Sequence, residues 1–166
     1  MNSIAKQLKD IVTTAKPRLL SIPEARASEK LYPDKWSIKQ ILGHLIDSAA
    51  NNHQRMVRMQ ETTNIGNLTY EQIHWVESQQ YQSEPWEDVV SLWCSYNTHI
   101  AHVIINVDAS TLGNLCDMGY DEPATLKFVI EDYVRHVQHH LDQIFSDVDP
   151  RERERWVTRR PSDIVP

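Results

Sequence analysis

Four long segments of this chain repeat their apolar residues every three or four positions, which is the spacing of an α-helix with one buried face. The expected helices cover residues 2–16, 37–60, 85–107 and 123–148. Each apolar stripe can be buried only against the others, so the pattern predicts an all-α protein built as a four-helix bundle. The small number of glycines, four in 166 residues, also favours helices over an all-β fold with its many tight turns.

Several residues mark where these helices begin and end. Ser37 is a plausible N-cap with Gln40 three residues later, as in a capping box. Pro85 suits the first turn of the third helix, and Pro17 is expected to mark a bend or the end of the first. Between the helices we expect a connection over 21–33 with a short helical turn, a short helix over 69–78, and a loop over 108–122.

The length of the chain suits one domain with a substantial core. We expect the bundle domain to span residues 1–148. Residues 149–166 form a densely charged extension with Arg151, Arg153, Arg155, Arg159 and Arg160. A solvated terminal extension is the expectation for this run, and a contact with a dimer partner or another protein is the alternative.

Charge and hydropathy exclude two classes of partner. The net charge of −6 argues against nucleic-acid binding, which normally shows as a basic excess on one face. No apolar run approaches the about 20 residues that a membrane span needs. The N-terminal segment carries charges and lacks the apolar core of a signal peptide, so we expect a cytoplasmic protein. Cys94 and Cys116 are far apart in the sequence and are expected to be free thiols in or near the core.

Histidines are the residues that point to chemistry. His136 and His140 lie four residues apart in the fourth helix, which places them on one face about 6 Å apart. His44 borders the buried stripe of the second helix and completes a set of three if the two helices pack together. Three neutral imidazoles leave coordination positions open, which is the arrangement of a catalytic metal rather than a structural one. Histidines spaced in this way also occur by chance, so a structural role is the alternative.

Each metal-binding histidine normally has a hydrogen-bond partner on its second ring nitrogen. By spacing, the candidates are Asp47 for His44, Asp132 for His136 and Gln143 for His140. The alternative is that these side chains are ordinary surface groups.

The other five histidines are expected to play no part in the metal site. His53 lies nine residues after His44 and should point to water on the opposite side of the helix. His99 and His102 are assigned surface or half-buried polar roles beside the core stripe. His139 points about 100° away from His140. His74 is read as a surface residue in a long aromatic connection that contains Tyr70, Trp75, Tyr81 and Trp86.

The segments 36–48 and 52–55 resemble the second helix of the DinB-like superfamily, 81–97 its third-helix region, and 133–144 its fourth helix. This resemblance implies an up-down-down-up four-helix bundle. It also implies a divalent metal bound by one histidine of the second helix and two of the fourth, which correspond here to His44, His136 and His140. The family includes YfiT-like bacillithiol transferases and mycothiol-dependent maleylpyruvate isomerases. The resemblance therefore suggests a bacterial cytoplasmic protein that forms a homodimer.

Three hypotheses for function follow. The first is a metal-dependent transferase that acts on a small-molecule substrate with a low-molecular-weight thiol, with zinc or nickel as the ion. The second is a metal-dependent hydrolase. The third is a non-enzymatic, stress-related module for metal binding or dimerisation. No residue outside the three histidines is indicated as a general base.

Overall fold

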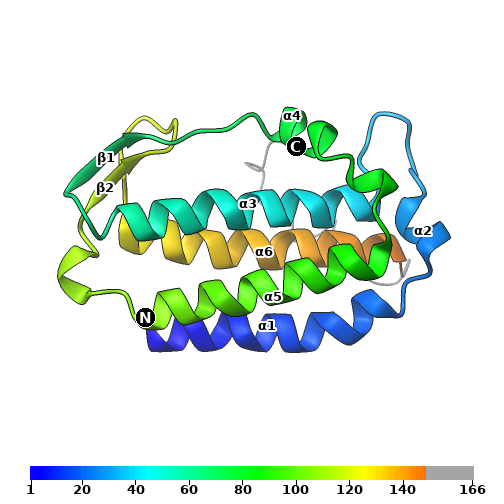
Figure 1. Ribbon diagram of the computed structural model, residues 1–166, viewed down its shortest axis with the longest axis horizontal. Helices are drawn as coiled ribbons and strands as arrows, with labels where there is room; N and C mark the ends of the chain where they lie inside the picture. Colours follow the sequence, from blue (N-terminus) through cyan, green and yellow to red (C-terminus); the bar gives the residue numbers. More distant parts are fainter. Residues whose placement is uncertain (149–166) are drawn as a thin grey trace.

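Four long helices form the bundle in the computed structural model, which describes residues 1–148 (Figure 1). They are α1 (Asn2–Leu20), α3 (Ile38–Arg58), α5 (Trp86–Ile105) and α6 (Leu126–Val148). Helices α1 and α6 run in one direction and α3 and α5 in the other, which confirms the predicted up-down-down-up order. Helix α3 packs against both α5 and α6, and α1 packs mainly against α5. The predicted extension at 149–166 lies outside the described residues.

The core is built from the predicted apolar stripes. Large side chains from all four long helices are fully buried, among them Leu8, Leu19, Ile41, Leu42, Leu45, Met56, Trp93, Ile100, Ile104 and Tyr133. Val148, the last residue of α6, is 41% exposed because it lies at the end of the bundle. Both cysteines are buried free thiols, as predicted.

The start of α3 matches its sequence signal. The Ser37 hydroxyl accepts a hydrogen bond from the Gln40 backbone N–H at 3.2 Å, and the Gln40 side chain accepts one from the Ser37 N–H at 3.1 Å. This reciprocal pair satisfies two backbone donors that have no partner within the helix. It fixes where the helix begins, and thus the rotation at which α3 presents His44 two turns later.

Pro17 was expected to mark a bend or the end of the first helix, and the second of these alternatives is wrong. Pro17 lies inside α1, which continues through Leu20. A proline removes one helical hydrogen bond, but only one turn follows here. The Ser21 backbone N–H closes that turn through hydrogen bonds to the carbonyls of Pro17 and Arg18, at 3.1 and 3.2 Å.

A small sheet occupies one end of the bundle, where the sequence predicted only loop over 108–122 (Figure 1). Strand β1 (Asn64–Asn67) pairs in parallel with β2 (Leu115–Asp117), which pairs antiparallel with β3 (Ala124–Thr125). Strands of two to four residues are too short to show an alternating pattern. The sheet ties the chain after α3 to the chain before α6, the two helices that carry the candidate metal ligands.

The connections between long helices carry short helical elements. Helix α2 (Glu24–Ser28) forms the helical turn expected in the first connection. Helix α4 (Gln72–Ser78) and the 3₁₀ turn η1 (Tyr81–Ser83) lie between α3 and α5, and both pack against α3. A further 3₁₀ turn, η2 (Ala109–Thr111), follows α5. Within residues 1–148, no helix combines the length and apolar character that crossing a membrane requires.

Candidate metal centre

Helices α3 and α6 bring His44, His136 and His140 together. Each contributes one ring nitrogen, and these three atoms lie within 4.8 Å of one another. The Nε2 atoms of His44 and His136 are 3.1 Å apart. Two nitrogens bound at about 2.0–2.1 Å to one ion would lie about 3 Å from each other, so this spacing fits a shared cation. No other group of three or more histidine, cysteine or acidic residues within residues 1–148 meets the same distance criterion.

Burial keeps these imidazoles neutral. It lowers the pKa of His44 to about 3, with a further contribution from the nearby His140. Burial likewise lowers the pKa of His140 to about 4, against an opposing hydrogen bond to Gln143, and the pKa of His136 lies well below its ordinary value. A neutral imidazole has a free lone pair, which is the form that binds a metal. The three rings are therefore ready to bind a cation at neutral pH without first losing protons.

One of the three predicted outer partners is present. The Nδ1 atom of His140 lies 2.9 Å from Oε1 of Gln143. An amide oxygen can only accept, so Nδ1 carries the proton and Nε2 presents its lone pair. The prediction for Asp132 is wrong, because its carboxylate accepts a hydrogen bond from Arg135 at 2.6 Å at the surface. An exposed arginine on the same helix is the easier partner for this carboxylate.

Asp47 is buried beside the centre but does not hydrogen-bond to His44. Its Oδ1 atom accepts hydrogen bonds from the hydroxyl of Tyr81, at 2.7 Å, and from the side-chain amide of Gln79. Its Oδ2 atom and the Nδ1 atom of His44 are both buried without a partner. Burial raises the pKa of Asp47, although the bonds from Tyr81 and Gln79 oppose this. An acceptor and a potential donor thus remain unpaired three residues apart on α3.

Aromatic rings flank the centre. The Trp36 ring lies 5.2 Å from that of His44, measured between centroids. The Tyr81 ring packs so closely over Gly43 that a Cβ atom at this position would lie 2.2 Å from the ring. Glycine disfavours a helix interior, and here the close approach of the ring explains its presence. Tyr81 thereby ties the α4–η1 segment to the turn of α3 that carries His44.

Of the remaining histidines, His139 lies outside the metal group as expected, whereas His53 does not point to water. His139 lies edge-on to His140 with ring centroids 5.2 Å apart and is not part of the three-histidine group. His53 was expected to point to water, but its ring is half-buried against α5. Its Nδ1 atom lies 3.2 Å from the Tyr96 hydroxyl. Helical geometry places His53 on the far side of α3 from His44, and that side faces α5 rather than solvent.

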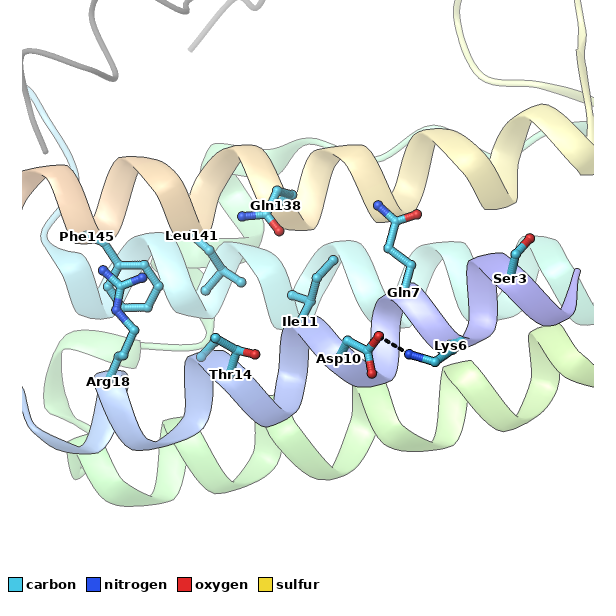
Figure 2. A pocket seen from close by; sticks show the side chains of 11 residues that line it. Ser3, Lys6, Gln7, Asp10, Ile11, Thr14, Arg18, Gln138, Leu141 and Phe145 are labelled. Carbon is cyan, nitrogen blue, oxygen red and sulfur yellow. Dashed lines mark hydrogen bonds and ion pairs between the residues drawn. The ribbon is translucent and has the colours of Figure 1, made fainter.

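A surface groove lies elsewhere, between α1 and α6 (Figure 2). It has a volume of about 430 Å³, and none of the three histidines lines it. Exposed polar side chains form most of its wall, including Lys6 and Asp10, which pair at 2.6 Å. The groove is therefore separate from the candidate metal centre.

The structure defines a helical bundle with three converging imidazoles from two helices. The chain belongs to the DinB superfamily, whose family model matches residues 7–144 and so includes all three histidines. It also resembles the solved structure of YfiT from Bacillus subtilis, which is described as a probable metal-dependent hydrolase with an unusual four-helix bundle topology. The TM-score is 0.79 at 16% sequence identity, and the match covers 93% of this chain and 87% of that one. No match was found among curated proteins.

Proposed function

We propose that His44, His136 and His140 bind one divalent cation and that the protein is an enzyme that depends on this ion. The observation that supports the proposal is the convergence of three neutral ring nitrogens within 4.8 Å. The pKa values of all three histidines are lowered by burial, so the lone pairs are available at neutral pH. The description of YfiT as a probable metal-dependent hydrolase supports the same class of protein.

The proposed ion is zinc or nickel, because imidazole ligands suit both. When bound, it would supply Lewis acidity that lowers the pKa of a coordinating nucleophile. The chain itself orients the ligands: Gln143 holds the ring of His140, and the packing of α3 on α6 sets the position of His44 relative to His136. The α4–η1 segment packs on α3, and we propose that it covers one side of the centre.

The proposed reaction is transfer of a low-molecular-weight thiol to a small electrophilic substrate. The thiol loses its proton to solvent, a sulfur–carbon bond forms, and the bond to the leaving group breaks. The resemblance of the helices to those of DinB-like thiol transferases supports this choice. Hydrolysis is the second candidate, and the description of YfiT favours it. The two reactions differ in whether the attacking nucleophile is a thiol or water.

Turnover by metal-stripped and reloaded protein tests this proposal. The protein should react with a chromogenic aryl halide in the presence of a bacterial low-molecular-weight thiol, lose this activity on chelation and regain it with zinc or nickel. Cleavage of a chromogenic ester without thiol would instead support hydrolysis. If the loaded protein turns over neither substrate while chelation lowers its melting temperature strongly, the ion is structural and the proposed enzyme is refuted.

We also propose that the protein acts as a homodimer in a bacterial cytoplasm and that its bundle domain spans residues 1–148. The family resemblance supports the dimer, and the extent of the family match supports the domain boundaries. Sedimentation of the full chain at several concentrations tests the dimer, because a monomer would show a constant mass near 19.3 kDa.

A further inference from the structure

A second group of histidines lies on the other side of α3. His53 of α3 lies against His99 of α5, His102 lies beside His99, and none of the three belongs to the candidate metal centre. His53 follows His44 by nine residues, which corresponds to a rise of about 13.5 Å along the helix and a rotation of about 180°. The two groups are thus separate places on the molecule.

The geometry of the pair His53–His99 matches that of the candidate metal centre. Their ring centroids are 5.1 Å apart and the rings are edge-on, at 84° to one another. Within the centre, His44 lies 5.1 Å from His136 and 5.0 Å from His140, each at 75°. The ring spacing and near-perpendicular orientation found in the centre therefore recur between α3 and α5.

His53 is already oriented by a hydrogen bond. Its Nδ1 atom lies 3.2 Å from the Tyr96 hydroxyl, just as Nδ1 of His140 lies 2.9 Å from Gln143. When Nδ1 donates its proton to the tyrosine oxygen, Nε2 presents a lone pair, as a metal-binding histidine requires. Partial burial and the neighbouring His99 lower the pKa of His53, which favours this neutral form.

We propose that His53 and His99 form a second cation site for a borderline divalent ion, such as zinc, nickel or copper, with His102 as a third donor. Imidazole is a ligand that these ions share. His102 stacks beside His99 with ring centroids 6.4 Å apart, and both side chains are exposed, so rotation of either ring meets little packing. An ion held there would link α3 to α5, and mass action would stabilise the bundle.

The second cation site does not depend on the proposed enzymatic activity. The number of zinc ions bound per chain tests it. Metal-stripped full-length protein is dialysed against buffered Zn²⁺ and its metal content is measured. We expect two equivalents for the wild type and for His74→Ala, a control that removes an exposed histidine of α4. His53→Ala and His99→Ala should each bind one equivalent, and His102→Ala should bind the second equivalent more weakly.

A second measurement identifies the ligands directly. Long-range ¹H–¹⁵N spectra should show the Nε2 resonance of His53 shifting as the second equivalent of Zn²⁺ is added. The same shift should persist in His140→Ala, where the candidate metal centre is damaged. Circular dichroism of each metal-free variant checks the fold. If no bound equivalent is lost in His53→Ala and His99→Ala, the proposal is overturned, whether or not the candidate metal centre holds an ion. If binding of that equivalent is unchanged in His102→Ala, His102 is not a ligand.

Discussion

His44 and His136 direct their Nε2 atoms toward each other across the α3–α6 interface at 3.1 Å, although 92 positions separate them in the sequence. In the neutral pair, only one of these nitrogens can donate a hydrogen bond to the other. The ring whose Nε2 donates cannot at the same time present a lone pair there. With a shared cation, both nitrogens would act as ligands, and both rings would carry their proton on Nδ1.

Loss of a ring from the centre should abolish tight metal binding. Loss of an outer hydrogen-bond partner typically weakens metal affinity by about 10- to 100-fold. We expect His140→Ala to weaken the affinity for zinc by more than this. The reason is that only two of the three converging nitrogens remain. Competition with a chelator of known affinity measures the change.

The matched control for this substitution is His139→Ala. His139 is the adjacent histidine, also half-buried, and lies outside the three-histidine group. It should leave the affinity of the centre within a factor of a few of the wild-type value. Equal loss in both variants would show that the effect comes from local unfolding of α6 rather than from a missing ligand.

Asp47 should support the centre from outside. Its unpartnered Oδ2 and the unpartnered Nδ1 of His44 belong to residues one turn apart on α3, and we expect a bound water to bridge them. We expect Asp47→Asn to weaken zinc binding by about 10- to 100-fold, because the amide is a poorer acceptor for the imidazole proton. Titration of metal-stripped protein gives the affinity.

Asp132, a carboxylate on α6, provides the control for Asp47 on α3. Asp132 pairs with Arg135 at the surface, so Asp132→Asn should leave metal binding unchanged. If Asp47→Asn also binds zinc with wild-type affinity, then Asp47 serves only to anchor Tyr81 and Gln79.

The long helices and the three histidines were predictable because their signals repeat or lie at fixed spacing. The i, i+4 spacing of His136 and His140 and the capping box at Ser37 each act within one helix, and both are present in the structure. The convergence of His44 with this pair was expected from the family resemblance, whereas other features that depend on contacts between distant segments were missed. In the small sheet, Asn67 of β1 pairs with Asp117 of β2, 50 residues later. The partners of Asp47 are Gln79, just after α4, and Tyr81 of η1. The spacing of residues within one segment does not show which distant segment it will contact.

The ion pair between Glu24 and Lys39 should make stability depend on pH in the acid range. Glu24 accepts hydrogen bonds from the nearly fully buried Lys39 ammonium group and from the Trp86 backbone N–H, at 2.7 Å for the latter. These contacts, the Lys39 bond first, lower the pKa of Glu24 from 4.5 to about 2. Since the unfolded chain binds the proton more readily, the stabilisation is complete above about pH 4.5 and is lost as pH falls toward 2.

The variant Glu24→Gln removes this titration. We expect its free energy of unfolding to be lower than that of the wild type at pH 7. The gap between the two free energies should narrow as pH falls from 4.5 to 2. Urea unfolding at several pH values measures both curves. In contrast, Glu29→Gln removes an exposed pair with Arg26 and should change the free energy of unfolding by less than about 1 kcal/mol. A Glu24→Gln curve parallel to the wild type across this range would contradict the prediction.

The close packing of Tyr81 on Gly43 should reverse the usual effect of a glycine-to-alanine change in a helix. Helix propensity alone predicts that Gly43→Ala stabilises the protein by about 1 kcal/mol. The added Cβ would meet the Tyr81 ring at 2.2–2.7 Å, so the ring must move. We therefore expect destabilisation by about 1–3 kcal/mol, together with weakened anchoring of the α4–η1 segment on Asp47. Urea unfolding at pH 7 measures the change.

Gly113→Ala is the control for Gly43→Ala, because a Cβ at Gly113 meets nothing within 4 Å. Its effect on the free energy of unfolding should stay within about 0.5 kcal/mol, as for most surface substitutions. Replacing Tyr81 by leucine should make room at position 43, so the two changes together should cost less than the sum of each alone. A strictly additive double variant, or a Gly43→Ala protein more stable than the wild type, would show that the ring does not constrain this turn of α3.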